Sequence, residues 1–125
     1  MRNAILLIDS DIGFLFWLGR LLDHAGYEAF PARSVPEAVA LLRELHLTVS
    51  LLIFDCTLEG ADDLVSGMRT RNRFLKTICL NGDGHMRCVV HTDAVCRKPG
   101  DIDEAAKSTW LQTVRSVLSA SMLLV

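Results

Sequence analysis

Short apolar runs alternate along the chain with segments in which apolar residues recur at helical spacing. The runs indicate buried strands at 4–9 (AILLID), 49–55 (VSLLIFD) and 77–80 (TICL), and further strands at 27–30 (YEAF) and 94–99 (AVCRKP). The segments between them favour helices at 12–25, 34–46 and 62–72. The last helix is predicted to begin near Thr109 and to run to about residue 121.

Capping residues agree with this pattern. Ser34 and Glu37 stand at capping-box spacing, and Pro36 lies in the first turn of the same helix, where its missing N–H costs nothing. Gly26 is expected to end the first helix as a C-terminal cap. Gln112 lies three residues after Thr109, which repeats the capping-box spacing at the last helix.

Apolar strands between amphipathic helices are typical of a parallel sheet covered on both faces. We therefore predict an α/β fold, a doubly wound five-stranded parallel sheet of the flavodoxin-like type with strand order 2-1-3-4-5. The length of 125 residues favours one domain over residues 1–125. Ligands of such folds bind beyond the carboxyl ends of the strands.

Two of the predicted strands end on a carboxylate, Asp9 and Asp55. The predicted strand order makes these strands neighbours, so both carboxylates share one edge of the sheet. Two carboxylates about 4 Å apart repel each other by roughly 4 kcal/mol at an effective dielectric constant of about 20. We therefore expect a positive group between them, either Lys98 at the end of the fifth strand or a hard cation such as Mg²⁺. The plainer alternatives are that Asp9 only caps the first helix and that Lys98 is a solvated charge.

Composition narrows the classes of function. The formal net charge is −2 and no basic run stands out, which argues against nucleic-acid binding. The longest apolar runs span about five residues, too few for a membrane helix, so no membrane contact is expected. The four cysteines form no C-x-x-C pair, and we expect reduced thiols and a cytoplasmic location.

Several stretches in this order resemble the receiver domain of bacterial response regulators. They are ILLIDSD for the first-strand acidic cluster, HAGYEA after the first helix, LLIFDCTLEGADDL for the phosphoacceptor strand and its loop, and CRKP after the fifth strand. The resemblance covers nearly the whole chain. It implies a signalling module of a two-component phosphorelay that takes a phosphoryl group from a histidine kinase or phosphotransferase. It implies no enzyme activity beyond self-catalysed phosphorylation and dephosphorylation of an aspartate.

Carried over by position, the resemblance makes Asp55 the phosphoacceptor and Asp9 a member of the acidic pair that binds Mg²⁺. Lys98 would be the lysine that pairs with the carboxylate and then with the phosphoryl oxygens. The backbone carbonyl of Thr57 would be a further metal ligand. The resemblance also implies a cis peptide bond between Lys98 and Pro99.

The sequence departs from the family at several positions. Ser10 stands where a second acidic metal ligand is usual, and Asp11 is a further candidate that would reach the site from the start of the helix. Asn81 replaces the hydroxyl residue that ends strand four, although its amide is able to donate to a phosphoryl oxygen. Val95 replaces an aromatic switch residue, and the fourth helix is expected to be short or missing. The alternative interpretation is therefore a pseudo-receiver, a protein-interaction module that works without phosphorylation.

The first helix carries two apolar stripes, although a surface helix needs only one. Ile12, Leu15, Gly19 and Leu22 form the stripe expected to face the sheet. The second stripe is either a wide core face or a contact face for a partner or a homodimer, and it consists of Phe14, Trp17, Leu18, Leu21 and Ala25. The apolar C-terminal end leaves room for an output domain in a longer chain. Regulation through a metal or a thiol is a third hypothesis, with Cys56 or the set His85, Cys88, His91 and Cys96 as its residues.

Overall fold

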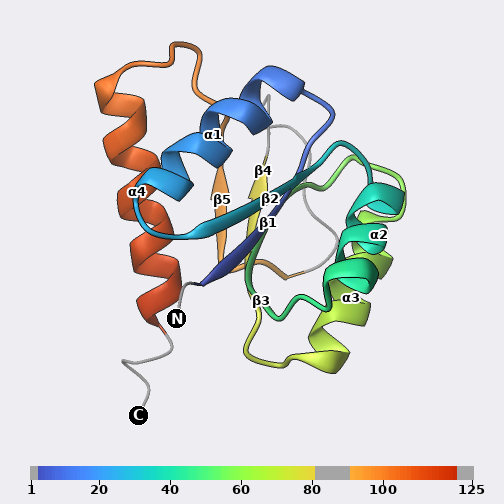
Figure 1. The fold of residues 1–125 in the computed structure, drawn as a ribbon. Coiled ribbons are helices and arrows are strands. Elements are labelled where there is room, and N and C mark those ends of the chain that lie inside the picture. The colour runs from blue at the N-terminus through green and yellow to red at the C-terminus, as the bar shows by residue number, and fades with distance from the viewer. Residues whose placement is uncertain (1–2, 81–90, 121–125) are drawn as a thin grey trace.

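The computed structural model describes residues 3–80 and 91–120. Their five strands form one parallel sheet in the order β2-β1-β3-β4-β5, with helices on both faces (Figure 1). The predicted fold class and strand order are therefore confirmed. In chain order the elements are β1 (Ala4–Ile8), α1 (Ile12–His24), β2 (Glu28–Ala32), α2 (Val35–Leu45), β3 (Val49–Asp55), α3 (Ala61–Arg71), β4 (Lys76–Leu80), β5 (Ala94–Cys96) and α4 (Glu104–Ser119).

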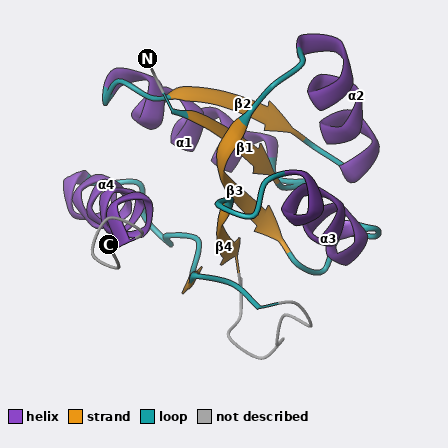
Figure 2. Cartoon of the chain, turned by 90° about the horizontal axis from the view of Figure 1, so that it is seen from below, coloured by secondary structure: helices purple, strands orange, loops and turns teal. Residues whose placement is uncertain are grey.

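Helices α1 and α4 cover one face of the sheet, and α2 and α3 cover the other (Figures 1 and 2). Successive side chains of a strand point to opposite faces. In β1, Ile5 and Leu7 accordingly pack with α1 and α4, whereas Leu6 and Ile8 pack with the α2 and α3 side. Every residue of β1 is buried, because the strand has a neighbour on each edge and helices on each face.

The turn from β1 into α1 consists of Asp9, Ser10 and Asp11. The N–H of Asp9 donates to the carbonyl of Ala32 at 3.1 Å, which extends the pairing of β1 with β2 by one residue. Asp11 is the N-cap of α1, and its side chain accepts from the N–H of Phe14 at 3.1 Å. The capping role therefore belongs to Asp11, and Asp9 lies at the end of the strand.

The last helix begins earlier than predicted. Helix α4 starts at Glu104, whereas the sequence pattern indicated a start near Thr109. The physical reason is the N-cap Asp103, whose side chain accepts from the N–H of Ala106 at 2.9 Å. Thr109 lies inside the helix, where its spacing to Gln112 has no capping role.

Both stripes of α1 belong largely to the core. Leu15 and Leu22 are buried as predicted, but Ile12 is 59% exposed because it is the first residue of the helix and extends past the sheet. In the second stripe Phe14 is buried, and its ring centroid lies 6.0 Å from that of Trp110 in α4. Trp17 packs against the same cluster. The second stripe therefore joins α1 to α4, in agreement with the core-face alternative, and a partner or homodimer contact through its half-buried residues stays a prediction.

Two further expectations concern the end of the sheet. The peptide bond between Lys98 and Pro99 is trans, so the cis bond expected from the resemblance is wrong. Trans is the isomer that X–Pro bonds prefer by about 0.5–1 kcal/mol. Asn81 and most of the connection from β4 to β5 lie outside the described residues. The described end of that connection, residues 91–93, contains no helix.

Candidate functional site

Asp9 and Asp55 lie next to each other at the carboxyl edge of the sheet. Ile8 of β1 is paired with Phe54 of β3, so the next residue of each strand is a carboxylate at the same level. Both side chains point to the face that α1 and α4 cover, since they follow Ile8 and Phe54 by one residue. The edge therefore concentrates negative charge, as the sequence indicated.

Lys98 brings the positive charge to this edge. Its Nζ lies 2.7 Å from Oδ1 of Asp9, and the exposed fractions of the two side chains are 27% and 0%. The ammonium group also lies 5.5 Å from the centroid of the Phe14 ring. A fully buried carboxylate is stable only when it is paired. Lys98 therefore neutralises Asp9, and among the described residues this is the ion pair that it makes.

The two oxygens of Asp9 have different surroundings. Oδ1 accepts from Lys98 and from the N–H of Asp11, the latter at 2.8 Å. Oδ2 is buried and has no hydrogen-bond partner among residues 3–80 and 91–120. An unpaired buried carboxylate oxygen is costly, and it is the kind of atom that a hard cation binds. The residues at this edge therefore fit a divalent cation through Asp9.

Asp55 is held by a tight turn at the end of β3. Its Oδ1 accepts from the N–H of Thr57 at 2.9 Å and from the Thr57 hydroxyl at 2.7 Å. The N–H of Leu58 donates to the carbonyl of Asp55 at 3.2 Å and closes the turn. These bonds fix the direction of the carboxylate. Because Asp55 is only half-buried, the carboxylate is also open to a reactant.

The acidic set is smaller than in the family that the sequence resembles. Ser10 is exposed and supplies a hydroxyl in place of a carboxylate, and Oδ1 of Asp11 is used to cap α1. Within residues 3–80 and 91–120, no group of three or more His, Cys, Asp or Glu side chains is placed to hold a metal ion. A cation at this edge would therefore rely on Asp9, Asp55 and backbone oxygens.

The cysteine next to the candidate acceptor is a poor nucleophile. Burial and then the charge of Asp55 raise the pKa of the Cys56 thiol, and burial raises the pKa of Cys96. A raised pKa lowers the thiolate fraction and slows thiol chemistry. Cys56 and Cys96 are free thiols, as the expectation of reduced cysteines requires at these two positions.

Four further positions of the predicted site lie on the chain between β4 and the end of β5. Asn81 lies outside the described residues, as do His85 and Cys88 of the loose metal-ligand set. Val95, at the position of the family's switch aromatic, is 60% exposed on β5. Its short side chain covers little of the sheet at that edge.

Sequence reasoning missed two contacts of the site. The hydroxyl and N–H of Thr57 hold Asp55, although only the Thr57 carbonyl was considered. The pattern Asp-x-Thr was a usable signal, because aspartate often accepts from the backbone N–H two residues later. Phe14 beneath Lys98 was missed as well. No local pattern marks that contact, since 84 residues separate the two positions (98 minus 14).

Comparison with solved structures identifies the fold. The receiver domain protein (CheY-like) from Methanospirillum hungatei JF-1 superposes with a TM-score of 0.80 at 20% identity, over 100% of both chains. The signal receiver domain of an HD domain-containing protein from Pseudomonas fluorescens Pf-5 gives a TM-score of 0.75 at 24% identity, over 95% of this chain and 88% of that one. NtrX from Brucella abortus, solved in complex with ADP, gives 0.79 at 18% identity, over 98% of this chain and 28% of the longer protein.

The chain therefore has the fold of response regulator receiver domains. A scan against protein-family models finds no match, and a search of curated proteins finds none either. Of the helices in the described part of the chain, none combines the length and the apolar character that crossing a membrane requires.

Proposed function

We propose that this chain is a receiver module of a two-component phosphorelay and that Asp55 accepts a phosphoryl group from a histidine kinase or phosphotransferase. One observation carries the proposal: Asp55 and the Asp9–Lys98 pair, with its 2.7 Å contact, meet at the same carboxyl edge of the sheet. A carboxylate fixed in direction beside a positive charge is what phosphoryl transfer requires, because the reaction depends on positioning and charge neutralisation.

The proposed reaction assigns a role to each residue. A carboxylate oxygen of Asp55 forms a bond to phosphorus while the bond from phosphorus to the donor imidazole nitrogen breaks. The electron pair stays on the imidazole nitrogen, and the product is an acyl phosphate on Asp55. Thr57 holds Oδ1 of Asp55 in direction throughout. Lys98 would exchange part of its contact with Asp9 for the phosphoryl oxygens.

Mg²⁺ belongs to this proposal as a weakly bound cofactor. Asp9, Asp55 and the carbonyl of Thr57 would hold it, with Asp11 as a further candidate ligand. When bound, the cation neutralises charge on the phosphoryl oxygens. Activity as an enzyme is not proposed beyond the making and breaking of this acyl phosphate. An output domain in a longer chain is in keeping with the neighbour NtrX, of which the aligned part is 28%.

Phosphorylation is tested by intact mass after incubation with acetyl phosphate and excess Mg²⁺. We expect one added phosphoryl group, lost on treatment with hydroxylamine, and no addition to Asp55→Asn. Asp101→Asn is the matched control, because Asp101 is an exposed carboxylate in a loop after β5. Unchanged mass of the folded parent under saturating donor would refute the phosphoacceptor role.

Magnesium binding is tested by titration calorimetry of the parent and of Ser10→Asp. The variant restores a third carboxylate to an edge that has two at the strand ends, so its attraction for the cation is greater. We expect the affinity for Mg²⁺ to rise by about tenfold or more, which corresponds to roughly 1.4 kcal/mol. Asp11→Ala is measured in parallel. Tight binding by the parent that is lost in Asp11→Ala would contradict the expectation and assign the missing ligand to Asp11.

A second candidate function is a docking module that needs no phosphorylation. The observation in its favour is that Lys98 is already bonded to Asp9, while Ser10 supplies no charge. A site neutralised from within has less need of a cation or a phosphoryl group. This candidate is preferred if Asp55→Asn binds a partner kinase or phosphotransferase as tightly as the parent does.

A further inference from the structure

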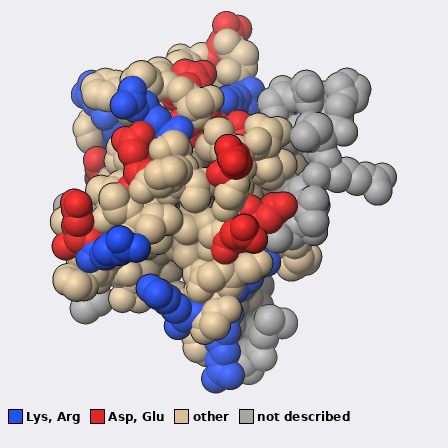
Figure 3. Space-filling view, turned by 90° about the vertical axis from the view of Figure 1, so that its right-hand side faces the viewer, with Lys and Arg blue, Asp and Glu red and all other residues tan. Residues whose placement is uncertain are grey.

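A groove lies on the face of the molecule opposite α1 and α4, between α2 and α3. Its volume is about 900 Å³, within the range of about 300–1,000 Å³ that is common for small-molecule sites. Figure 3 shows this face as uncharged at its centre, with basic and acidic side chains around the edge. The apolar lining includes Val35, Val39, Leu42, Leu64, Met68 and Leu75.

The groove is open on the α3 side because one of its lining residues there is a glycine, which has no side chain to fill the space. Gly67 lines the groove, and a Cβ added there would meet no atom within 4 Å. Glycine inside a helix is less stable than alanine, so this position lowers the stability of α3 without a packing reason. Gly60 lines the far end of the groove, where an added Cβ would lie 3.4 Å from Val35.

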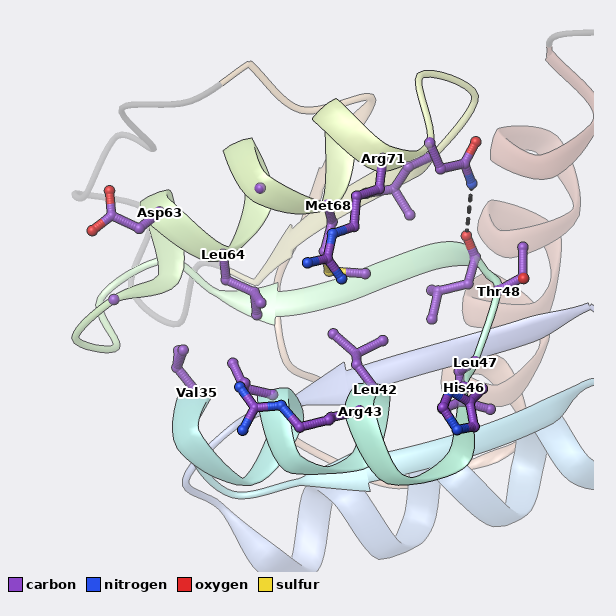
Figure 4. Close-up of a pocket in the computed structure, with 16 residues that line it drawn as sticks. Val35, Leu42, Arg43, His46, Leu47, Thr48, Asp63, Leu64, Met68 and Arg71 are labelled. Carbon is purple, nitrogen blue, oxygen red and sulfur yellow. Dashed lines mark hydrogen bonds between the residues drawn. The ribbon is translucent and has the colours of Figure 1, made fainter.

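Charge on the groove is unevenly distributed. Arg71 points toward the space between the two helices beside Met68, Arg43 lies along α2 at the edge of the groove, and Asp63 stands apart at the other end (Figure 4). The ion pairs that involve the described residues include neither arginine. His46 also lines the groove, near the end of α2. Two guanidinium groups that make no ion pair with a described residue, at the border of an apolar groove, suit a ligand with an apolar body and one negative head group.

We propose that the groove between α2 and α3 binds a small amphipathic anion, an alkyl carboxylate in the simplest case. The alkyl chain would lie on Leu42, Leu64 and Met68, and the carboxylate would meet Arg43 and Arg71. Both helices have 11 residues and are therefore about 16 Å long, enough to cover an extended alkyl chain. The inference is independent of phosphorylation, since no residue of the Asp9 and Asp55 edge lines the groove.

Decanoate is the probe, and decyltrimethylammonium, with the same alkyl chain and a positive head group, is its control. Both are titrated below their micelle concentrations and followed by the amide shifts of the isotope-labelled protein. We expect saturable shifts from decanoate at Val39, Leu64 and Met68 and no saturation with the cation. Equal response to both amphiphiles, or shifts spread over the α1 and α4 face, would overturn the proposal.

Two variants separate the apolar floor from the charge. Gly67→Leu fills the groove and keeps α3 stable, because leucine is a better helix former than glycine. Ser66→Leu adds the same side chain at an exposed position that does not line the groove. We expect decanoate binding to be lost in the first variant and unchanged in the second. Binding that survives in folded Gly67→Leu would show that decanoate occupies another place.

The charge is tested with Arg71→Gln against Arg73→Gln, since Arg73 is exposed and does not line the groove. We expect a two- to fivefold loss of decanoate affinity in the first, which is about the effect of one exposed ion pair. Arg73→Gln should bind as the parent does. Equal decanoate affinities of the two variants would show that Arg71 does not contact the bound carboxylate.

Discussion

At the scale of single residues, the central feature is that Lys98 pairs with Asp9 and not with Asp55. Asp9 is fully buried, and Asp55 is half-buried with two hydrogen bonds from Thr57. A buried charge gains more from a partner than a solvated one does, because water screens the latter. The ammonium group therefore lies with Asp9, above the ring of Phe14.

The pairing predicts an unequal response to mutation. Lys98→Met leaves Asp9 buried without a counter-charge, and we expect the free energy of unfolding to fall by about 2 kcal/mol, less than for a fully buried pair since Lys98 is partly exposed. Lys107→Met is the matched control. It breaks the exposed pair with Glu104, whose contact is 3.1 Å, and should cost at most about 0.5 kcal/mol. Urea denaturation of both variants gives the comparison.

A double variant completes this test. Asp9→Asn removes the buried charge, so Asp9→Asn with Lys98→Met should lose less stability than the sum of the single variants, by at least about 0.5 kcal/mol. Strict additivity would mean that the two side chains do not stabilise each other in solution.

The sequence predicted which residues would meet at this edge, but not how their atoms pair. Strand endings and parallel order were enough to bring Asp9 and Asp55 together, because register follows from the apolar pattern. The bond from Lys98 to Asp9 depends on burial and on the distant Phe14. Neither the burial of Asp9 nor the position of Phe14 can be predicted from the residues next to Lys98 in the sequence.

At the scale of elements, the bounds of β3, which has a strong apolar pattern, were predicted correctly, whereas the start of α4 was not. The third strand was predicted at 49–55 and found at Val49–Asp55. The start of α4 was misplaced because its first turn, Glu104 to Lys107, contains no large apolar residue that would mark a buried stripe. Asp103 was the signal that would have corrected it, since aspartate before a run of good helix formers is a preferred N-cap.

The boundary of α4 predicts the result of two substitutions. Asp103→Ala removes the acceptor of the Ala106 N–H, whose bond is 2.9 Å long, and should lower the free energy of unfolding by about 1 kcal/mol. Thr109→Ala should be neutral or slightly stabilising, because alanine is the better residue inside a helix. Thermal melts of both variants decide the matter. A larger loss from Thr109→Ala would place the start of α4 where the capping-box spacing first suggested.

At the scale of the whole molecule, a chain of side-chain contacts leads from the candidate acceptor edge into α1. Lys98 lies over Phe14 at 5.5 Å, and Phe14 contacts Trp110 of α4 at 6.0 Å between centroids. On the other side of the edge, Val95 is exposed on β5 and has no ring that moves between buried and exposed positions. The contacts present therefore favour a response that passes from the acceptor edge into α1.

This arrangement predicts where a phosphoryl mimic acts. Beryllofluoride on Asp55, with saturating Mg²⁺, should draw Lys98 away from Asp9 and so alter the surroundings of Phe14. A ligand shifts a conformational equilibrium only through its different affinity for the two states, and here those states differ in the partner of Lys98. We expect large amide shift changes at Asp9, Phe14 and Lys98, a smaller change at Trp110, and little change at Val95. The same titration of Lys98→Met should leave Phe14 unaffected while the loop after Asp55 still responds. Changes at Val95 as large as those at Phe14 would show instead that β5 carries the response by a route that does not need an aromatic side chain.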